Sequence, residues 1–226
     1  MSTPNQNETP MSIEEIFRNL EITFDKKSSS EEINKAQNRL MEMDIQILNL
    51  LKFILEGISK NDNFSESVKL SALIYLKNTI TNRIKSKKIS DEEIWAILHI
   101  FIEFLIFSEL SDKIISNTNS LIQTIFSSKL VQKKSGKVIE LYFMMEKYLI
   151  GIIEQNPLND LSFNIGIFKR IISFFQMMIS TKAINENNIE ECFKVNLILI
   201  DIILGKNLSL ISEIIKQNPN ADTICP

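Results

Sequence analysis

The sequence has few of the residues that break a chain into turns or supply reactive groups. Only five Gly, five Pro, two Cys and one His occur among 226 residues. Few glycines leave few turns with positive φ, which argues against hairpin-rich β folds. Cys192 and Cys225 are isolated, so they form neither a disulfide framework nor a zinc site, and they fit a reducing compartment. At this length the core can be stable without metals or disulfides.

Excess charge and long apolar runs are also missing. The net charge is −3, which gives no basic surface for nucleic acid or for a membrane. The polar N-terminus lacks the apolar segment of a signal peptide. The longest apolar run, residues 94–107, is interrupted by His99 and Glu103 and is too short to span a bilayer. We predict no nucleic-acid partner and no membrane insertion.

Helix-start signals recur along the chain. In each, a Ser or Asn is followed three residues later by Glu, the spacing of an N-cap that accepts a backbone N–H. These pairs are Ser12 with Glu15, Ser29 with Glu32, Asn63 with Glu66, Ser90 with Glu93, and Asn187 with Glu190. Between them the apolar residues keep a helical period. Buried strands are the alternative for the Ile- and Phe-rich runs at 94–107 and 193–204, but those runs are longer than strands usually are.

The pattern predicts an all-α protein. The expected helices span residues 12–25, 29–43, 45–60, 64–85, 90–107, 110–128, 136–155, 159–180, 187–205 and 207–217. They pair into about five helical hairpins beginning near residues 12, 45, 90, 136 and 187, a spacing loosely consistent with a solenoid. Helices that are apolar on two sides must pack on neighbouring hairpins. We expect a right-handed α-α superhelix, similar to ARM-type solenoids, over residues 12–217, with a disordered tail at 1–11 and a frayed tail at 218–226.

Residue patterns of catalysis or cofactor binding are missing as well. No phosphate-binding glycine loop, nucleophile elbow, zinc motif or calcium loop occurs. Gly136 and Gly205 are interpreted as helix-boundary glycines. We expect His99 to be half-buried with one hydrogen bond, since it has no partners for catalysis. Paired glutamates lie in first helical turns, where they oppose the helix dipole. We therefore predict no catalytic residues, no cofactor, no metal and no enzymatic activity.

One segment, residues 65–85, carries a family resemblance. SESVKLSALIYLKNTITNRIK resembles a helix in the second repeat of importin-β-type (karyopherin-β) nuclear transport receptors. The matching positions are Val68, Lys69, Ala72, Ile74, Leu76, Lys77, Asn78 and Ile80. The order of the elements around this helix, over residues 12–130, also resembles the N-terminal region of that family.

The resemblance implies a HEAT-repeat superhelix whose first repeats bind a small GTPase of the Ran type. It also implies cargo proteins and Phe-Gly nucleoporins as partners elsewhere, and shuttling between cytoplasm and nucleus in protein transport. The family usually has a Trp near the end of this helix and a Trp and a Pro after the third repeat, and this sequence has neither there. The chain is expected to be either an N-terminal piece of a longer receptor or a reduced relative.

The residues of this helix divide into two sets. Val68, Ala72, Leu76 and Ile80 form the expected packed stripe. The candidate protein-binding residues are Lys69, Lys77, Asn78, Thr81, Arg83 and Lys85. Outward cations there, together with the basic stretch 83–88, form either a solvated helix face or a contact for an acidic partner. The alternative function is a HEAT- or ARM-type scaffold with no GTPase partner.

Overall fold

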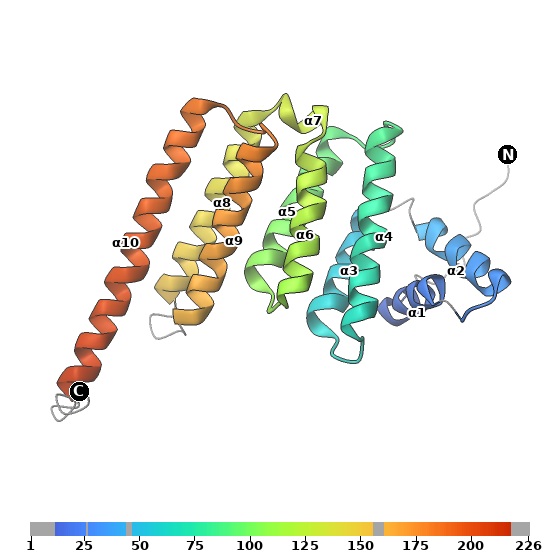
Figure 1. Ribbon diagram of the computed structural model, residues 1–226, viewed down its shortest axis with the longest axis horizontal. Coiled ribbons are helices and arrows are strands. Elements are labelled where there is room, and N and C mark those ends of the chain that lie inside the picture. The colour runs from blue at the N-terminus through green and yellow to red at the C-terminus, as the bar shows by residue number, and fades with distance from the viewer. Residues whose placement is uncertain (1–11, 26, 44–46, 156–160, 218–226) are drawn as a thin grey trace. The chain divides into compact units, whose positions relative to one another are not determined.

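The computed structural model describes residues 12–25, 27–43, 47–155 and 161–217, and gives the backbone alone for residues 43, 161–164 and 206–217. All regular structure in these residues is helical, which confirms the all-α prediction (Figure 1). The helices are α1 Ile13–Phe24, α2 Ser30–Met43, α3 Ile47–Lys60, α4 Glu66–Lys85, α5 Asp91–Phe107, α6 Asp112–Phe126, α7 Lys129–Gln132, α8 Ser135–Gln155, α9 Leu161–Ser180 and α10 Glu186–Gln217.

Contacts divide the chain into two compact units. Unit 1 comprises Met1–Phe104 and Ser108–Leu121, and unit 2 comprises Leu105–Phe107 and Ile122–Pro226. The expected tails at 1–11 and 218–226 lie outside the described residues. A single repeat domain over residues 12–217 stays a prediction.

In unit 1, α1 packs against α2, α3 and α4, and α3 runs antiparallel to α4 (Figure 1). Gly57 of α3 lies against α1, where an added Cβ would lie 2.8 Å from Cζ of Phe17 and 2.9 Å from Cγ2 of Ile13. The Phe17 ring is fully buried and stacks on Phe64, with ring centroids 4.2 Å apart. Glycine at position 57 therefore allows α1 to sit directly on α3.

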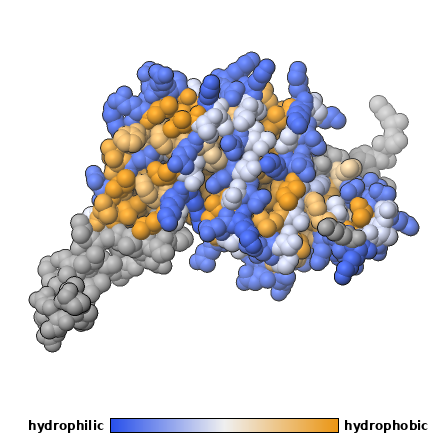
Figure 2. All heavy atoms as spheres, in the orientation of Figure 1, coloured by the Kyte–Doolittle hydropathy of each residue, from blue (hydrophilic) through white to orange (hydrophobic). Residues whose placement is uncertain are grey.

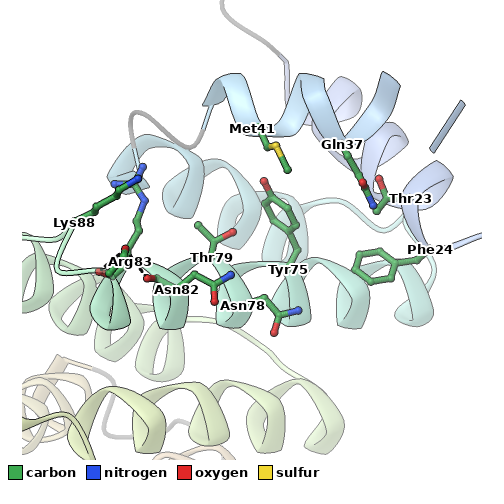
Figure 3. Close-up of a pocket in the computed structure, with 11 residues that line it drawn as sticks. Thr23, Phe24, Gln37, Met41, Tyr75, Asn78, Thr79, Asn82, Arg83 and Lys88 are labelled. Carbon is green, nitrogen blue, oxygen red and sulfur yellow. Dashed lines mark hydrogen bonds between the residues drawn. The ribbon is translucent and has the colours of Figure 1, made fainter. Parts of the chain in front are cut away.

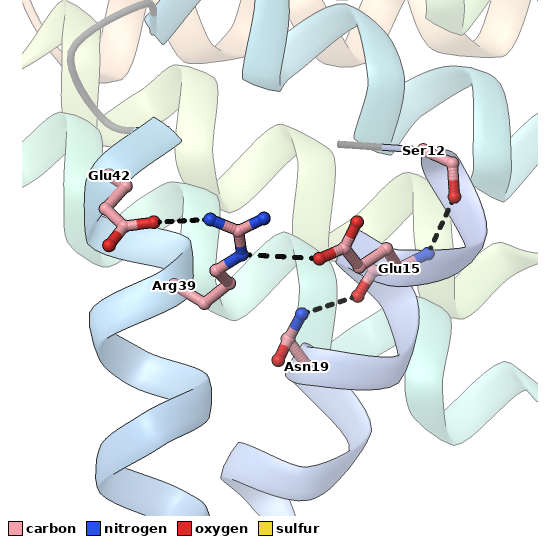
Figure 4. Close-up of polar contacts among 5 residues, drawn as sticks. All are labelled: Ser12, Glu15, Asn19, Arg39 and Glu42. Atoms are coloured by element: carbon pink, nitrogen blue, oxygen red, sulfur yellow. Dashed lines mark hydrogen bonds and ion pairs between the residues drawn. The ribbon is translucent and has the colours of Figure 1, made fainter. Parts of the chain in front are cut away.

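Polar contacts hold α1 to α2 at the surface (Figure 4). Arg39 of α2 donates from Nε to Glu15 Oε1 of α1 at 3.3 Å and from Nη1 to Glu42 Oε2 at 2.8 Å. Asn19 Nδ2 donates to the carbonyl oxygen of Glu15 at 2.8 Å. These carboxylates raise the pKa of Arg39, Glu42 contributing most. The guanidinium thus bridges the two helices, although water screens such exposed ion pairs and they add little to stability.

Three of the five expected N-caps are confirmed. Ser12 accepts from the Glu15 N–H at 3.1 Å, and Ser29 and Ser90 each form a reciprocal capping box with the glutamate three residues later. The N-caps predicted at Asn63 and Asn187 are wrong. The cap of α4 is Ser65, which accepts from Val68 N, and Asn185 accepts from Asn188 N at the start of α10. In both cases another short polar residue stands closer to the true first turn.

In unit 2, α8 packs against α9 and both contact α10. A buried polar contact joins α8 to α10: the Tyr142 hydroxyl donates to Asn196 Oδ1 at 2.6 Å. Burial raises the pKa of Tyr142 far above its usual range. Arg170 of α9 donates to the carbonyl oxygen of Leu105. The ring of Phe126 meets Phe174 edge-on at 5.2 Å, which adds aromatic packing to this core.

Two predictions about the second half of the chain are wrong. The expected fifth hairpin is one continuous helix, α10, with Gly205 inside it rather than at a boundary. A glycine inside a helix costs about 1 kcal/mol relative to alanine, and the helix continues through Gly205 despite that cost. The short helix α7 was not expected, because four residues carry no periodic signal.

One face of α10 is apolar and open among the described residues. Phe193, Leu197 and Leu204 recur at helical spacing, and each exposes about half of its side chain. Figure 2 shows apolar side chains gathered over this helix. A neighbouring face, with Cys192, Asn196 and Leu199, is buried. The helix is thus covered on one side by the described residues of unit 2.

Candidate functional site

Helix α4 in unit 1 positions the residues that the sequence singled out. Ser65 caps its first turn, and Ala72, Leu76 and Ile80 are buried with exposed fractions of 0–2%. These three residues confirm the expected packed stripe, and Val68 at its N-terminal end is half-buried. The stripe fixes the rotation of the helix, and therefore which of its polar residues point away from the core.

The C-terminal end of α4 turns sharply at Lys87. That residue has φ of 55°, and the Lys88 N–H donates to the carbonyl oxygen of Arg83 at 2.9 Å. The Lys87 N–H donates to the carbonyl oxygen of Ile84 at 3.2 Å. These bonds form a Schellman motif with a lysine in the left-handed position that glycine usually takes. The turn carries Lys88 back alongside Arg83.

An open groove lies between α4 and the α1–α2 hairpin (Figure 3). It encloses about 740 Å³, a volume within the usual range for ligand sites. Its lining residues come from three helices and from the turn after α4. They are Thr23, Phe24, Gln37, Met41, Tyr75, Asn78, Thr79, Asn82, Arg83, Ser86 and Lys88.

The groove has a basic end and an apolar end. Arg83 and Lys88 lie together at one end, and Phe24 lies at the other (Figure 3). Phe24 and Met41 expose 42% and 60% of their surface, so both offer apolar area to a ligand in the groove. The lining residues in the described part of the chain carry two cations and no carboxylate. The groove therefore attracts an anionic group at one end and apolar surface at the other.

A second hollow continues along α4 beyond Phe24. It encloses about 620 Å³ and is lined along α4 by Ser67, Val68 and Ser71. Phe24 lines both hollows, so they adjoin at that ring. The second hollow carries charges of both signs, from Arg18, Glu21, Asp25 and Lys27. The combined surface follows α4 for almost its whole length.

The six candidate binding residues are spread over different faces of α4. Asn78 and Arg83 line the groove. Lys77 instead donates from Nζ to Ser120 Oγ of α6 at 2.8 Å, so its ammonium contacts α6 rather than the groove. Lys85 is exposed in the last turn. Lys69 and Thr81 are half-buried and line neither hollow.

Sequence reasoning missed the opposite wall of the groove. Thr23, Phe24, Gln37 and Met41 come from α1 and α2, and no local pattern indicates that these helices face α4. Lys88 belongs to the basic stretch that the sequence showed, but its approach to Arg83 depends on the turn at Lys87. The exposure of Phe24 and Met41 is known only from the structure, so the sequence carries no signal that locates this wall.

Reactive groups elsewhere in the described residues do not form a site. No group of three or more His, Cys, Asp or Glu in that part of the chain could hold a metal ion. Cys192 is buried, and burial is the main cause that raises its pKa to about 11. His99 is exposed, contrary to the half-buried position expected, because it shares a polar face of α5 with Glu92 and Glu103.

No helix within the described residues is long and apolar enough to cross a membrane. Compared with family models, curated proteins and solved structures, the chain gives no match.

Proposed function

We propose that this chain is a non-enzymatic protein-binding module of HEAT-like helical hairpins that binds a small GTPase of the Ran type through α4. The observation that carries the proposal is the open, basic groove along α4, the helix with the importin-β resemblance. Asn78 and Arg83 line that groove, and Lys85 is exposed in the last turn of the same helix. Open surfaces along stacked helix pairs are what repeat proteins use to bind partners.

The electrostatics favour fast and specific association. Rim cations mainly steer a partner and set the salt dependence of binding, whereas each exposed pair adds only about 0–1 kcal/mol. The half-exposed apolar side chains of Phe24 and Met41 supply the area that such charges lack. A role in nucleocytoplasmic protein transport, in the cytoplasm and the nucleus, follows from the same proposal. Cargo proteins and Phe-Gly nucleoporins would bind elsewhere.

The test is a pulldown with purified Ran-type GTPase in its GTP-analogue and GDP forms. We expect capture of the GTP form at several times the level of the GDP form. The double variant Arg83→Glu with Lys85→Glu should lose that capture. The variant Lys35→Glu, an exposed lysine on α2 that lines neither hollow, should keep it. Equal capture of both nucleotide forms, or no capture of either, rules out the GTPase.

A second candidate is a HEAT- or ARM-type scaffold without a GTPase partner. The bond from Lys77 to Ser120 favours it, because this lysine of the resembling motif makes an internal contact instead of being free for a partner. The family Trp and Pro positions, which this sequence lacks, favour it as well. The two candidates separate in the pulldown, since a scaffold binds its partners without regard to nucleotide.

A further inference from the structure

We propose that the groove between α4 and the α1–α2 hairpin binds an extended, acidic peptide segment of a partner protein, with one apolar side chain seated against Phe24 and Met41. This inference rests on the proposed protein-binding function and names the chemistry of what enters the site. Three features of the groove carry it: its length, its amide side chains and its charge.

The length fits an extended chain. The two adjoining hollows follow α4 from Ser67 to Ser86, which at 1.5 Å per residue is about 28 Å. An extended peptide advances about 3.4 Å per residue, so about eight residues span this distance. A globular ligand would fill only part of it. The groove and the second hollow together thus have the proportions of a peptide site on an open surface.

The amides of α4 match the repeat of an extended backbone. Asn78 and Asn82 lie one turn apart, about 6 Å along the helix axis. Residues on one side of an extended peptide recur every 6.8 Å or so. Each Asn side chain offers a carbonyl acceptor and an NH₂ donor, the complement of a peptide C=O and N–H. Both side chains are exposed, and neither has a hydrogen-bond partner among the described residues. They can therefore bind alternate peptide units.

Charge and apolar surface set the direction and the sequence preference. Arg83 and Lys88 lie at one end, with no carboxylate in the lining to neutralise them. Aspartate or glutamate in the peptide would form charge-assisted hydrogen bonds there. Phe24 and Met41 offer exposed apolar surface farther along the groove. The flexible thioether side chain of Met41 can adapt to the shape of a ligand. The preferred segment therefore has acids at one end and a Leu- or Phe-like residue near its middle.

Fluorescence anisotropy of the whole chain with a labelled peptide tests the inference. The probe is a peptide of about ten residues with a run of aspartates at one end, a central leucine, and Ser and Gly elsewhere. We expect saturable binding with Kd below about 0.5 mM. A peptide with Asn in place of every Asp, and one with Ser in place of the Leu, should each bind at least about fivefold more weakly.

The chain offers a matched control for the protein side. The double variant Arg83→Glu with Lys88→Glu should weaken binding at least about tenfold, since it repels the acids directly. Lys35→Glu with Lys52→Glu makes the same double charge reversal at exposed positions that line neither hollow, and should weaken binding less than about threefold at physiological salt. Asn78→Ala with Asn82→Ala, at exposed positions that leave the core intact, should weaken binding about fivefold or more.

Two results would overturn the inference. One is the absence of saturable binding by the wild-type chain. The other is an equal loss of affinity in the Lys35–Lys52 and Arg83–Lys88 double variants, which would mean attraction to net charge without a site. The inference and the proposed function fail separately. If the chain captures the GTP-loaded GTPase but does not bind the peptide, only the peptide site is ruled out. If it binds the peptide but not the GTPase, only the GTPase partner is ruled out.

Discussion

Lys77 of α4 donates a hydrogen bond from Nζ to Ser120 Oγ of α6, with 2.8 Å between the two atoms. This contact separates two faces of α4. One face is tied to α6, and the other, with Asn78 and Asn82, is open to the groove beside α1 and α2. A lysine that the sequence places among candidate binding residues is therefore part of the fold of unit 1.

The Lys77 contact predicts a change in stability without a change in binding. Lys77→Met keeps the aliphatic packing but removes the bond to Ser120, so the free energy of unfolding should fall by about 1 kcal/mol. Peptide affinity should change less than about twofold, because Nζ is bonded to α6 rather than lining the groove. Urea denaturation and anisotropy measure the two quantities. A double-mutant cycle with Ser120→Ala isolates the pair, and additivity of the two substitutions would contradict a direct contact.

Replacing glycine by alanine should have opposite effects on stability at Gly57 and at Gly151. Gly57→Ala places a methyl group against Phe17 and Ile13, which overpacks the α1–α3 contact and should destabilise unit 1 by about 1–3 kcal/mol. Gly151→Ala is the control. Its added Cβ meets nothing within 4 Å, so it should stabilise α8 by about 0.5–1 kcal/mol through helix propensity. Urea denaturation of both variants checks the signs, and a neutral or stabilising Gly57→Ala would be inconsistent with the contact described.

The two left-handed lysines predict a gain in stability. Lys87 and Lys182 have φ of 55° and 54°, and each ends a helix in the same pattern of hydrogen bonds. Lys87→Gly and Lys182→Gly should each raise the free energy of unfolding by about 0.5–1 kcal/mol, since glycine adopts this conformation without a Cβ clash. Lys87→Ala and Lys182→Ala keep the Cβ and should show no such gain. A gain with alanine equal to that with glycine would assign the effect to charge instead.

Glu66 predicts a pH-dependent contribution to the stability of unit 1. It accepts hydrogen bonds from Lys113 Nζ at 2.9 Å and Ser111 Oγ at 2.7 Å, and these lower its pKa below the ordinary value of 4.5, the bond to Lys113 contributing most. The folded state thus favours the ionised carboxylate. The stabilisation is present above the ordinary pKa and is lost as the pH falls through the lowered value.

Glu66→Gln should therefore be less stable than the wild type near neutral pH, and the difference should disappear in acid. Thermal melts from pH 7 downward measure the difference. Lys113→Met should remove most of the same pH-dependent part. A difference between wild type and Glu66→Gln that stays constant across this range would show that the ion pair does not set the pKa.

The sequence predicted α4 well because its signals are local. The expected helix at 64–85 agrees with Glu66–Lys85 within two residues, and the buried positions Ala72, Leu76 and Ile80 follow from helical periodicity. The side of α4 on which Lys77 makes its contact could not be predicted in the same way. Periodicity assumes one packed side, whereas α4 packs against α1 and α3 and also hydrogen-bonds α6.

The groove itself depends on tertiary contacts. Its second wall, from Phe24 to Met41, is set by how α1 and α2 pack on α4, and a single sequence carries no signal for that geometry. The continuous α10 was missed for a different reason. Gly205 looks like a helix end when only local propensity is considered, yet α10 continues through it to Gln217.

Site-directed photo-crosslinking tests most directly whether a partner protein binds in this groove. A benzophenone side chain would replace Asn82 in the groove and, in a matched variant, Lys35 on α2 outside both hollows. Each variant is then irradiated with the GTP-loaded Ran-type GTPase. We predict a crosslinked product from position 82 and none from position 35. Equal products from both positions, a product from position 35 alone, or none from either would contradict binding in the groove.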